Sequence, residues 1–412
     1  MRRPTALLLL PALLLPLAVA TPATASDNDQ RPRTRLATTG ECEFGGKPIP
    51  GRPWALQRVQ LDRLWAESQG EGVRVAVIDS GVDVRNPQLR PAVDVGSGRD
   101  FVKPKKDDPE NLPKGPTVDL VGHGTKVAGI IAARPDPRTG FVGLAPKATI
   151  IPIRQNDGEG GGNAENLAQS VDHAVRQGAD VINISQDADR PLGPDSLLYQ
   201  AVRRAIDAGV VVVASAGNDG ADGKLKETYP AAIPGVLAVA ASDRNNERAV
   251  FSQRGHFVGI AAPGVDIVST VPRGGHCADN GTSFAAPYVA AVAALLRAKH
   301  RRWTPQQIVA QLQQTAERPV SGRDHHIGWG VVDPLRALTE DERPITRPVG
   351  REGVENAPAP EPAELTLTET YAQRNERLGT YALLVSLTLT ALVACVARIL
   401  RDRRRHRSAA DR

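Results

Sequence analysis

The sequence predicts an α/β fold, in which a mainly parallel β-sheet is sandwiched between helices, plus one C-terminal transmembrane helix. Continuous apolar runs of strand length alternate with helical segments, as in "LAQSVDHAVRQGADVINIS" and "LLYQAVRRAIDAGVVVVASAGN". Strands that are buried on both faces are typical of parallel sheets covered by helices. A mostly apolar stretch of about twenty residues near the C-terminus is long enough to cross a bilayer as one helix. The 412 residues leave room for one large domain with appendages.

Residues 1–25 are typical of a secretory signal peptide. Two arginines precede an apolar stretch over residues 6–20, and an Ala-x-Ala site ends at Ala25. This pattern predicts cleavage after Ala25 and export of the mature chain, with a membrane anchor as the alternative.

Residues 26–53 are predicted to be an N-terminal extension, and residues 54–340 the main domain. The extension is polar and punctuated by Pro and Gly, without a sustained apolar period. The main domain opens with "WALQRVQLDRLW", which predicts a short amphipathic helix from Trp54 to Trp65. "VRVAVID" then predicts a strand ending at Asp79, and "HGTKVAGIIAA" predicts a helix beginning near His123.

The C-terminal region divides into a Pro/Glu-rich linker at 341–377, a transmembrane helix at 378–398 and a basic tail at 399–412. A buried core helix is the alternative for the apolar stretch, but the arginine cluster "RILRDRRRHR" directly after it indicates a cytoplasmic flank. Much of the formal net charge of +5 lies in this cluster. The main domain is therefore not expected to bind nucleic acid.

The three cysteines of the chain leave one pair outside the predicted membrane helix. Cys395 falls within that helix, so Cys42 and Cys277 are predicted to form a disulfide in the exported part. The alternative is two unpaired cysteines, because sequence alone does not show that the two residues lie close together.

A charged loop between the first strand and His123 contains Asp107, Asp108 and Glu110, which could suggest a calcium site. Prolines and lysines are interspersed among these carboxylates, which favours a solvated surface loop. We expect no metal and no cofactor.

Three short motifs carry the chemistry: "VIDSGVD" around Asp79, "GHGTKVAG" around His123 and "NGTSFAAP" around Ser283. Taken singly, each residue has a structural alternative as a turn or helix-start residue, and Ser283 could be a helix cap. A serine hydroxyl is a poor nucleophile at neutral pH, so an imidazole must remove its proton, and a buried carboxylate must orient that imidazole. Together, Asp79, His123 and Ser283 are therefore predicted to form a catalytic triad. At a helix start, Ser283 would also face backbone N–H groups that stabilise an oxyanion.

This order of Asp, His and Ser, with a strand before the first motif and helices after the other two, resembles that of the subtilisin-like serine proteases over residues 54–340. The resemblance implies a subtilisin-like fold and an endopeptidase that forms an acyl-enzyme, with Asn218 of "ASAGNDG" as second oxyanion donor. It also implies that an extended peptide substrate binds along "INISQDAD", near Ser185, Gln186 and Gly217.

The sequence departs from the family at the substrate segment. Many members have Ser-Leu-Gly where this chain has Ser185-Gln186-Asp187. The bulkier and charged replacement predicts a narrow substrate range.

Signal peptide, protease body, Pro-rich spacer, single C-terminal helix and basic tail together resemble the mycosins, which are membrane-anchored proteases associated with type VII secretion systems of actinobacteria. The resemblance implies limited cleavage of exported protein substrates beside a type VII secretion membrane complex. It also implies a single-pass protein of the cell membrane, with its catalytic domain on the extracytoplasmic side and an extension that wraps this domain without closing its site. Two alternatives stay open, namely a structural component that stabilises the complex, with catalysis secondary, and a general surface-degrading subtilase.

Overall fold

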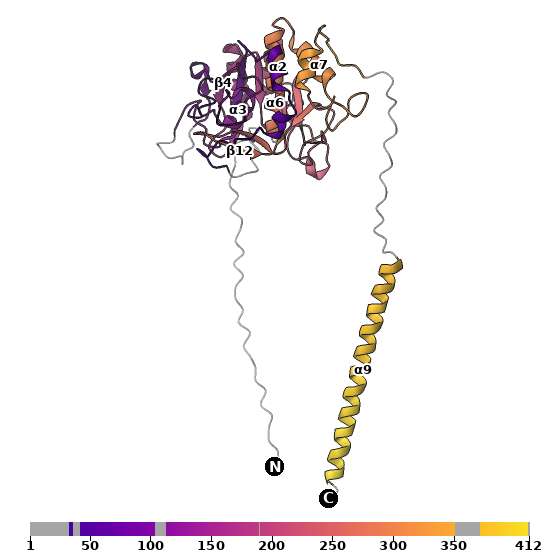
Figure 1. Ribbon diagram of the computed structural model, residues 1–412. Helices are drawn as coiled ribbons and strands as arrows, with labels where there is room; N and C mark the ends of the chain where they lie inside the picture. Colours follow the sequence, from indigo (N-terminus) through magenta and orange to yellow (C-terminus); the bar gives the residue numbers. More distant parts are fainter. Residues whose placement is uncertain (1–32, 36–41, 104–112, 189, 351–370, 411–412) are drawn as a thin grey trace. The chain divides into compact units, whose positions relative to one another are not determined.

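The computed structural model describes residues 33–35, 42–103, 113–188, 190–350 and 371–410 (Figure 1). The predicted signal peptide at 1–25, the acidic loop residues Asp107, Asp108 and Glu110, and residues 351–370 of the predicted linker lie outside these ranges. The chain forms two units, a body that ends at Glu355 and a C-terminal unit from Asn356 onward.

A seven-stranded sheet, in which every neighbouring pair of strands is parallel, forms the centre of the body. This confirms the predicted α/β class. In spatial order the strands are β10 (Val258–Pro263), β9 (Leu237–Ser242), β8 (Val211–Ser215), β6 (Val181–Ile184), β2 (Arg74–Asp79), β4 (Thr149–Arg154) and β3 (Arg99–Asp100).

The strand order reverses at β2, because β4 pairs on one side of it and β6 on the other. In open parallel sheets, the crevice at the carboxyl ends of the strands beside such a reversal is the usual place for a ligand site. β2 ends at Asp79, so the fold places this carboxylate where a site is expected.

Alternate residues of β2 face two apolar cores, one on each side of the sheet. Val75 and Val77 belong to the larger core, whereas Ala76 and Ile78 belong to the smaller one. The larger core is covered by α1 (Trp54–Gln57), α2 (Leu61–Glu67), α3 (His123–Ala132), α6 (Thr282–Lys299), α7 (Pro305–Thr315) and α8 (Pro334–Thr339) (Figure 1). The smaller core is covered by α4 (Ala164–Arg176) and α5 (Leu197–Asp207).

The predicted helix from Trp54 to Trp65 is wrong in its continuity, because α1 and α2 are separate short helices. Each tryptophan is anchored by its own long-range hydrogen bond: Trp54 Nε1 donates to the Val265 carbonyl at 3.0 Å and Trp65 Nε1 to the Leu144 carbonyl at 2.9 Å. Two independent anchors explain why the amphipathic pattern does not form one helix. The helix predicted to begin near His123 is confirmed as α3.

Smaller elements surround the sheet. β1 (Arg33–Arg35) lies between β5 (Gly161–Asn163) and β7 (Asp187–Ala188), and β11 (Ile267–Thr270) forms an antiparallel hairpin with β12 (His276–Asp279). Two 3₁₀ helices span Val95–Ser97 and Gly220–Asp222.

The C-terminal unit contains α9 (Tyr371–Ala410), a single continuous helix. Its part from Tyr371 to Arg401 is long and apolar enough to cross a membrane, and its side chains are exposed. The span predicted from sequence, 378–398, falls within this range.

Candidate active site

Asp79 and His123 form a buried pair at the carboxyl end of the sheet. His123 Nδ1 lies 2.8 Å from Asp79 Oδ1, and both side chains are 0% exposed. A carboxylate only accepts, so Nδ1 carries a proton and donates the hydrogen bond. In the described part of the chain, no group hydrogen-bonds to His123 Nε2. The pair therefore leaves the second ring nitrogen of His123 uncommitted.

Local backbone geometry brings these two residues together. Gly122, at the start of α3, has a left-handed φ of 80°, which glycine adopts without steric cost. A Cβ on Gly124 would lie 2.1 Å from the Gly81 carbonyl oxygen and 3.0 Å from Asp79 Cβ. Only glycine at 124 lets the first turn of α3 approach the end of β2 this closely.

A second buried carboxylate, Asp119, supports the start of α3 and was not singled out from the sequence. It accepts hydrogen bonds from Thr125 Oγ1 at 2.6 Å, Gly122 N at 2.7 Å, Thr125 N at 2.8 Å and Ser80 Oγ at 2.8 Å. Burial raises the pKa of Asp119, although these hydrogen bonds oppose that rise. The sequence signal for Asp119 is an acidic residue shortly before a helix start, where unpaired backbone N–H groups accumulate.

Ser283 is the second residue of α6 and is 2% exposed. The N-cap of this helix is Gly281, and no side chain caps it, so the cap interpretation of Ser283 is wrong. Pro287 has no N–H and cannot donate the helical hydrogen bond to the Ser283 carbonyl. Ser185 Oγ donates to that carbonyl instead, at 2.8 Å. A predicted substrate-binding residue is thus bonded directly to the backbone of the predicted nucleophile.

The amide of Asn218 is oriented by the residue before Ser283. Thr282 donates to Asn218 Oδ1 through its backbone N at 2.9 Å and through its hydroxyl at 3.0 Å. Both bonds use the amide oxygen, so the NH₂ group of Asn218 stays available as a donor. The neighbouring Gly217 has φ 99°, and a Cβ there would lie 2.8 Å from Thr228 Cγ2. Gly217 therefore allows close approach at the edge of the site.

Gln186 points into the protein. It is 2% exposed, and its Oε1 accepts a hydrogen bond from Gln155 Nε2. The adjacent Asp187 is only half-buried, and its Oδ2 would lie 3.4 Å from a Cβ added to Gly217. Of the two residues that depart from the family pattern, Asp187 is therefore the one beside the edge of the site.

The N-terminal extension reaches this region as β1. Thr34 pairs with Gly162 of β5 on one side and with Ala188 of β7 on the other, antiparallel to both. β7 follows directly after Ser185 and Gln186. The extension thus occupies the strand position between β5 and β7, beside the predicted substrate segment, whereas the resemblance to mycosins implied an extension that leaves the site open.

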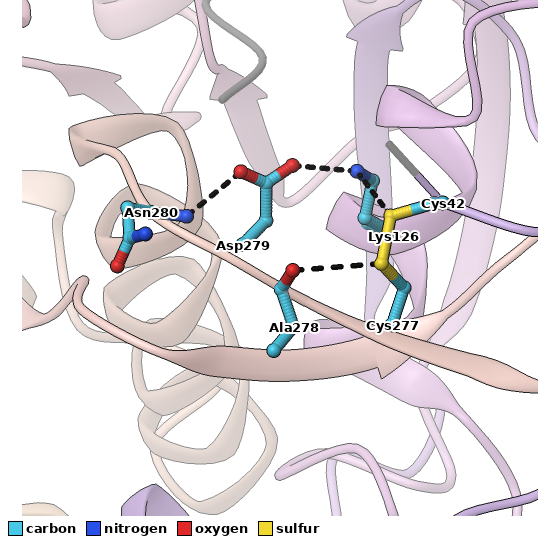
Figure 2. Close-up of a disulfide and its surroundings, with 6 residues drawn as sticks. All are labelled: Cys42, Lys126, Cys277, Ala278, Asp279 and Asn280. Atoms are coloured by element: carbon cyan, nitrogen blue, oxygen red, sulfur yellow. Dashed lines mark hydrogen bonds and ion pairs between the residues drawn. A yellow bond between two sulfur atoms is a disulfide. The ribbon is translucent and has the colours of Figure 1, made fainter. Parts of the chain in front are cut away.

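The predicted disulfide between Cys42 and Cys277 is confirmed, with a Cα–Cα distance of 5.8 Å (Figure 2). It joins the extension to β12, across 235 residues of sequence. Among the described residues, no group of three or more His, Cys, Asp or Glu side chains could hold a metal ion.

Comparison with known proteins identifies the family of the chain. Residues 70–330 match the Subtilase family. The chain is 36% identical to Subtilisin E of Bacillus subtilis (strain 168) over 283 residues, which are 68% of this chain and 70% of that protein. It is 37% identical to Thermitase of Thermoactinomyces vulgaris over 287 residues, which are 70% of this chain and 96% of that protein.

Solved structures of type VII secretion proteases are similar as well. The structure of MycP3 protease from the type VII (ESX-3) secretion system matches with a TM-score of 0.62 at 34% identity, over 76% of this chain and 93% of that chain. MycP1 from Mycobacterium smegmatis matches with a TM-score of 0.62 at 30% identity, over 80% of this chain and 94% of that chain. These similarities cover the body that carries the site.

Proposed function

The chain belongs to the subtilase family, as a serine endopeptidase of the mycosin type, and we propose that it cleaves a narrow set of exported proteins through an acyl-enzyme formed on Ser283. The observation that carries the proposal is the buried Asp79–His123 pair with its uncommitted Nε2. The His123 ring lies 5.2 Å from the ring of Phe284, the residue next to Ser283. The base and the nucleophile are thereby assigned to adjoining parts of one site.

In the first step, His123 Nε2 takes the proton of the Ser283 hydroxyl as Oγ attacks the scissile carbonyl carbon. The ring then carries a positive charge, which the buried Asp79 carboxylate stabilises. The carbonyl oxygen becomes an oxyanion, which accepts from the Asn218 NH₂ group and from backbone N–H at the start of α6.

In the second step, the tetrahedral intermediate collapses. The C–N bond breaks, His123 gives its proton to the leaving amine, and an ester to Ser283 Oγ remains. Water then attacks this ester with His123 again as base, which releases the second product and restores the serine.

Replacing Ser283 tests the assignment. Ser283→Ala is expected to abolish peptide hydrolysis, because the hydroxyl that forms the ester is missing. Ser170→Ala is the matched control: Ser170 is also buried, but it lies in α4 and donates to the Asn166 carbonyl. Hydrolysis by Ser283→Ala at the rate of the control variant would contradict the proposal.

β1 supports a strand-like mode of substrate binding. An extended peptide that joins β5 and β7 as a central strand would use the same backbone groups that pair with β1. We therefore infer that the extension competes with the substrate. Thr34→Pro removes a strand N–H and is expected to lower KM, whereas Thr34→Val keeps the ladder and should leave KM unchanged. Equal KM values for both variants would count against this mode of binding.

The membrane arrangement is part of the proposal. The apolar helix is followed by the arginines of the tail, and such a flank favours the cytoplasmic side. The protein would then be single-pass, with the protease body on the extracytoplasmic side. Proteolysis of an added impermeant reporter protein by intact cells, but not by cells that carry Ser283→Ala, would support this orientation.

A structural role in a secretion complex is the second candidate function. It is favoured by the similarity to MycP1, described as an essential component of the type VII (ESX-1) secretion system, at 30% identity. Complementing a deletion strain with the wild type or Ser283→Ala, at equal membrane levels, separates the two functions. Restored export of secretion substrates by the wild type alone means that catalysis is required, and restoration by both means that the complex needs only the folded protein.

A further inference from the structure

A buried ion pair lies behind the triad and takes no part in the chemistry described above. Lys126 Nζ lies 2.6 Å from Asp279 Oδ2, with the two side chains 2% and 0% exposed. Lys126 follows His123 by three residues in α3, and Asp279 is the last residue of β12, four residues before Ser283. The pair therefore joins the helix that carries the base to the strand that leads into the nucleophile.

Lys126 lies close both to a neighbour of the triad and to the extension. Lys126 Nζ lies 5.5 Å from the centroid of the Phe284 ring, whose other neighbour is His123. Cys42 Sγ, in the extension, lies 3.6 Å from the same Lys126 Nζ (Figure 2). The disulfide thus places the extension directly against a charged group that is almost completely buried.

Burial of this pair calls for an explanation other than stability. Removing two charges from water offsets much of their mutual attraction, and apolar residues of similar volume are often as stabilising. A buried pair does, however, fix the relative position of the elements that it joins, because an alternative arrangement would leave a charge unpaired in the interior. In this chain, the elements so joined are α3 and the segment before α6.

We propose that Lys126 and Asp279 are positioning residues that set His123 relative to Ser283, and that the Cys42–Cys277 disulfide holds the extension over this pair. The proposal rests on the proposed protease function and deepens it. Positioning errors of about 1 Å reduce turnover by up to about 100-fold, so even small relaxation of the pair should be visible in kcat. The extension would then assist catalysis through its covalent anchor.

The test uses the full-length protein in detergent, assayed with a peptide substrate and counted with a serine-reactive active-site titrant. Lys126→Met/Asp279→Asn removes both charges and keeps an oxygen at residue 279 for the Asn280 N–H, which now donates to Asp279 Oδ1 at 2.8 Å. We expect kcat per titrated site to fall by about 10- to 100-fold, with KM changed less than about twofold. A double variant that keeps the wild-type kcat per titrated site would overturn the proposal.

The matched control is Arg74→Met/Asp94→Asn. This pair, with Arg74 Nη2 at 3.0 Å from Asp94 Oδ2, lies at the opposite end of β2 from Asp79. Its removal is expected to leave kcat unchanged. An equal fall of kcat in the control would mean that any lost ion pair slows the enzyme, and would also overturn the proposal.

A second variant keeps the test decisive if the first does not fold. Cys42→Ser/Cys277→Ser leaves the ion pair in place but removes its covalent cover, so kcat per titrated site should fall several-fold, while KM should not rise, because a loosened extension competes less with the substrate. An unchanged kcat in this variant would refute the role of the disulfide. Failure of the proposed function is distinguishable, because the wild type would then show no hydrolysis that depends on Ser283.

Discussion

Acid should loosen the extension from the body through His276. Its Nδ1 accepts from Ile49 N at 3.1 Å, and its Nε2 is 2.8 Å from Gln88 Oε1, to which it donates. Only the neutral ring makes both bonds, because a protonated Nδ1 cannot accept. Burial lowers the pKa of His276 from 6.5 to about 4, and the Asp136 carboxylate opposes this only in part. Asp136 has a pKa of about 2, so it stays ionised throughout the relevant pH range.

The direction and size of the pH effect on folding stability follow from these pKa values. Below pH 6.5 the unfolded chain takes up a proton at this position, whereas the folded chain does so only near pH 4. The contribution to stability is therefore complete above pH 6.5 and is lost as the pH falls toward 4. One pKa unit corresponds to about 1.36 kcal/mol, so the loss approaches about 3 kcal/mol, of which about 2.5 kcal/mol should be gone by pH 4.5.

The assay is urea unfolding of the full-length protein in detergent, followed by tryptophan fluorescence, at several pH values between 7.5 and 4.5. His276→Gln keeps an oxygen acceptor and an N–H donor but does not titrate, so it serves as the reference. The free energy of unfolding of the wild type should fall more steeply with acid than that of the variant. Parallel curves for the two proteins would refute a neutral, doubly bonded His276.

Three further predictions concern the site. Asn218→Ala should lower kcat by about 100- to 1,000-fold, the loss found when an oxyanion donor of this kind is removed, while KM for a peptide changes little; an unchanged kcat would remove Asn218 from the mechanism. Gly124→Ala forces a Cβ to within 2.1 Å of the Gly81 carbonyl oxygen, so hydrolysis and the thermal midpoint should both fall, whereas Gly193→Ala, where nothing lies within 4 Å, should leave both unchanged. The rate should decrease in acid, because only an imidazole with a free lone pair can act as the base, and a rate–pH curve with an acid optimum would contradict this role of His123.

Local patterns were sufficient to predict the parts of the fold and site that depend on short segments. The sheet was predictable because fully apolar strand runs have few alternatives to burial between helices. Asp79, His123 and Ser283 could be singled out because each lies in a short motif next to a predicted strand end or helix start. Asp79 and His123 form a hydrogen-bonded pair in the structure, and the catalytic roles of the three residues stay a prediction.

Several features that depend on distant segments were not predictable. The division of the first helix depends on carbonyls that accept from Trp54 and Trp65 and lie far along the chain. The inward orientation of Gln186 depends on Gln155 from another strand end. The sequence also gives no sign that Lys126 is buried, since an isolated lysine in a helix normally faces water.

Identification of the residue that becomes acylated tests most directly whether Ser283 is the nucleophile. The full-length protein would be incubated with an acylating peptide ester, quenched in acid during the burst, digested and analysed by mass spectrometry. We expect one acyl group on the peptide that contains Ser283, absent in Ser283→Ala and formed far more slowly in His123→Ala. An acyl group on another residue, or a burst that persists in Ser283→Ala, would contradict this assignment.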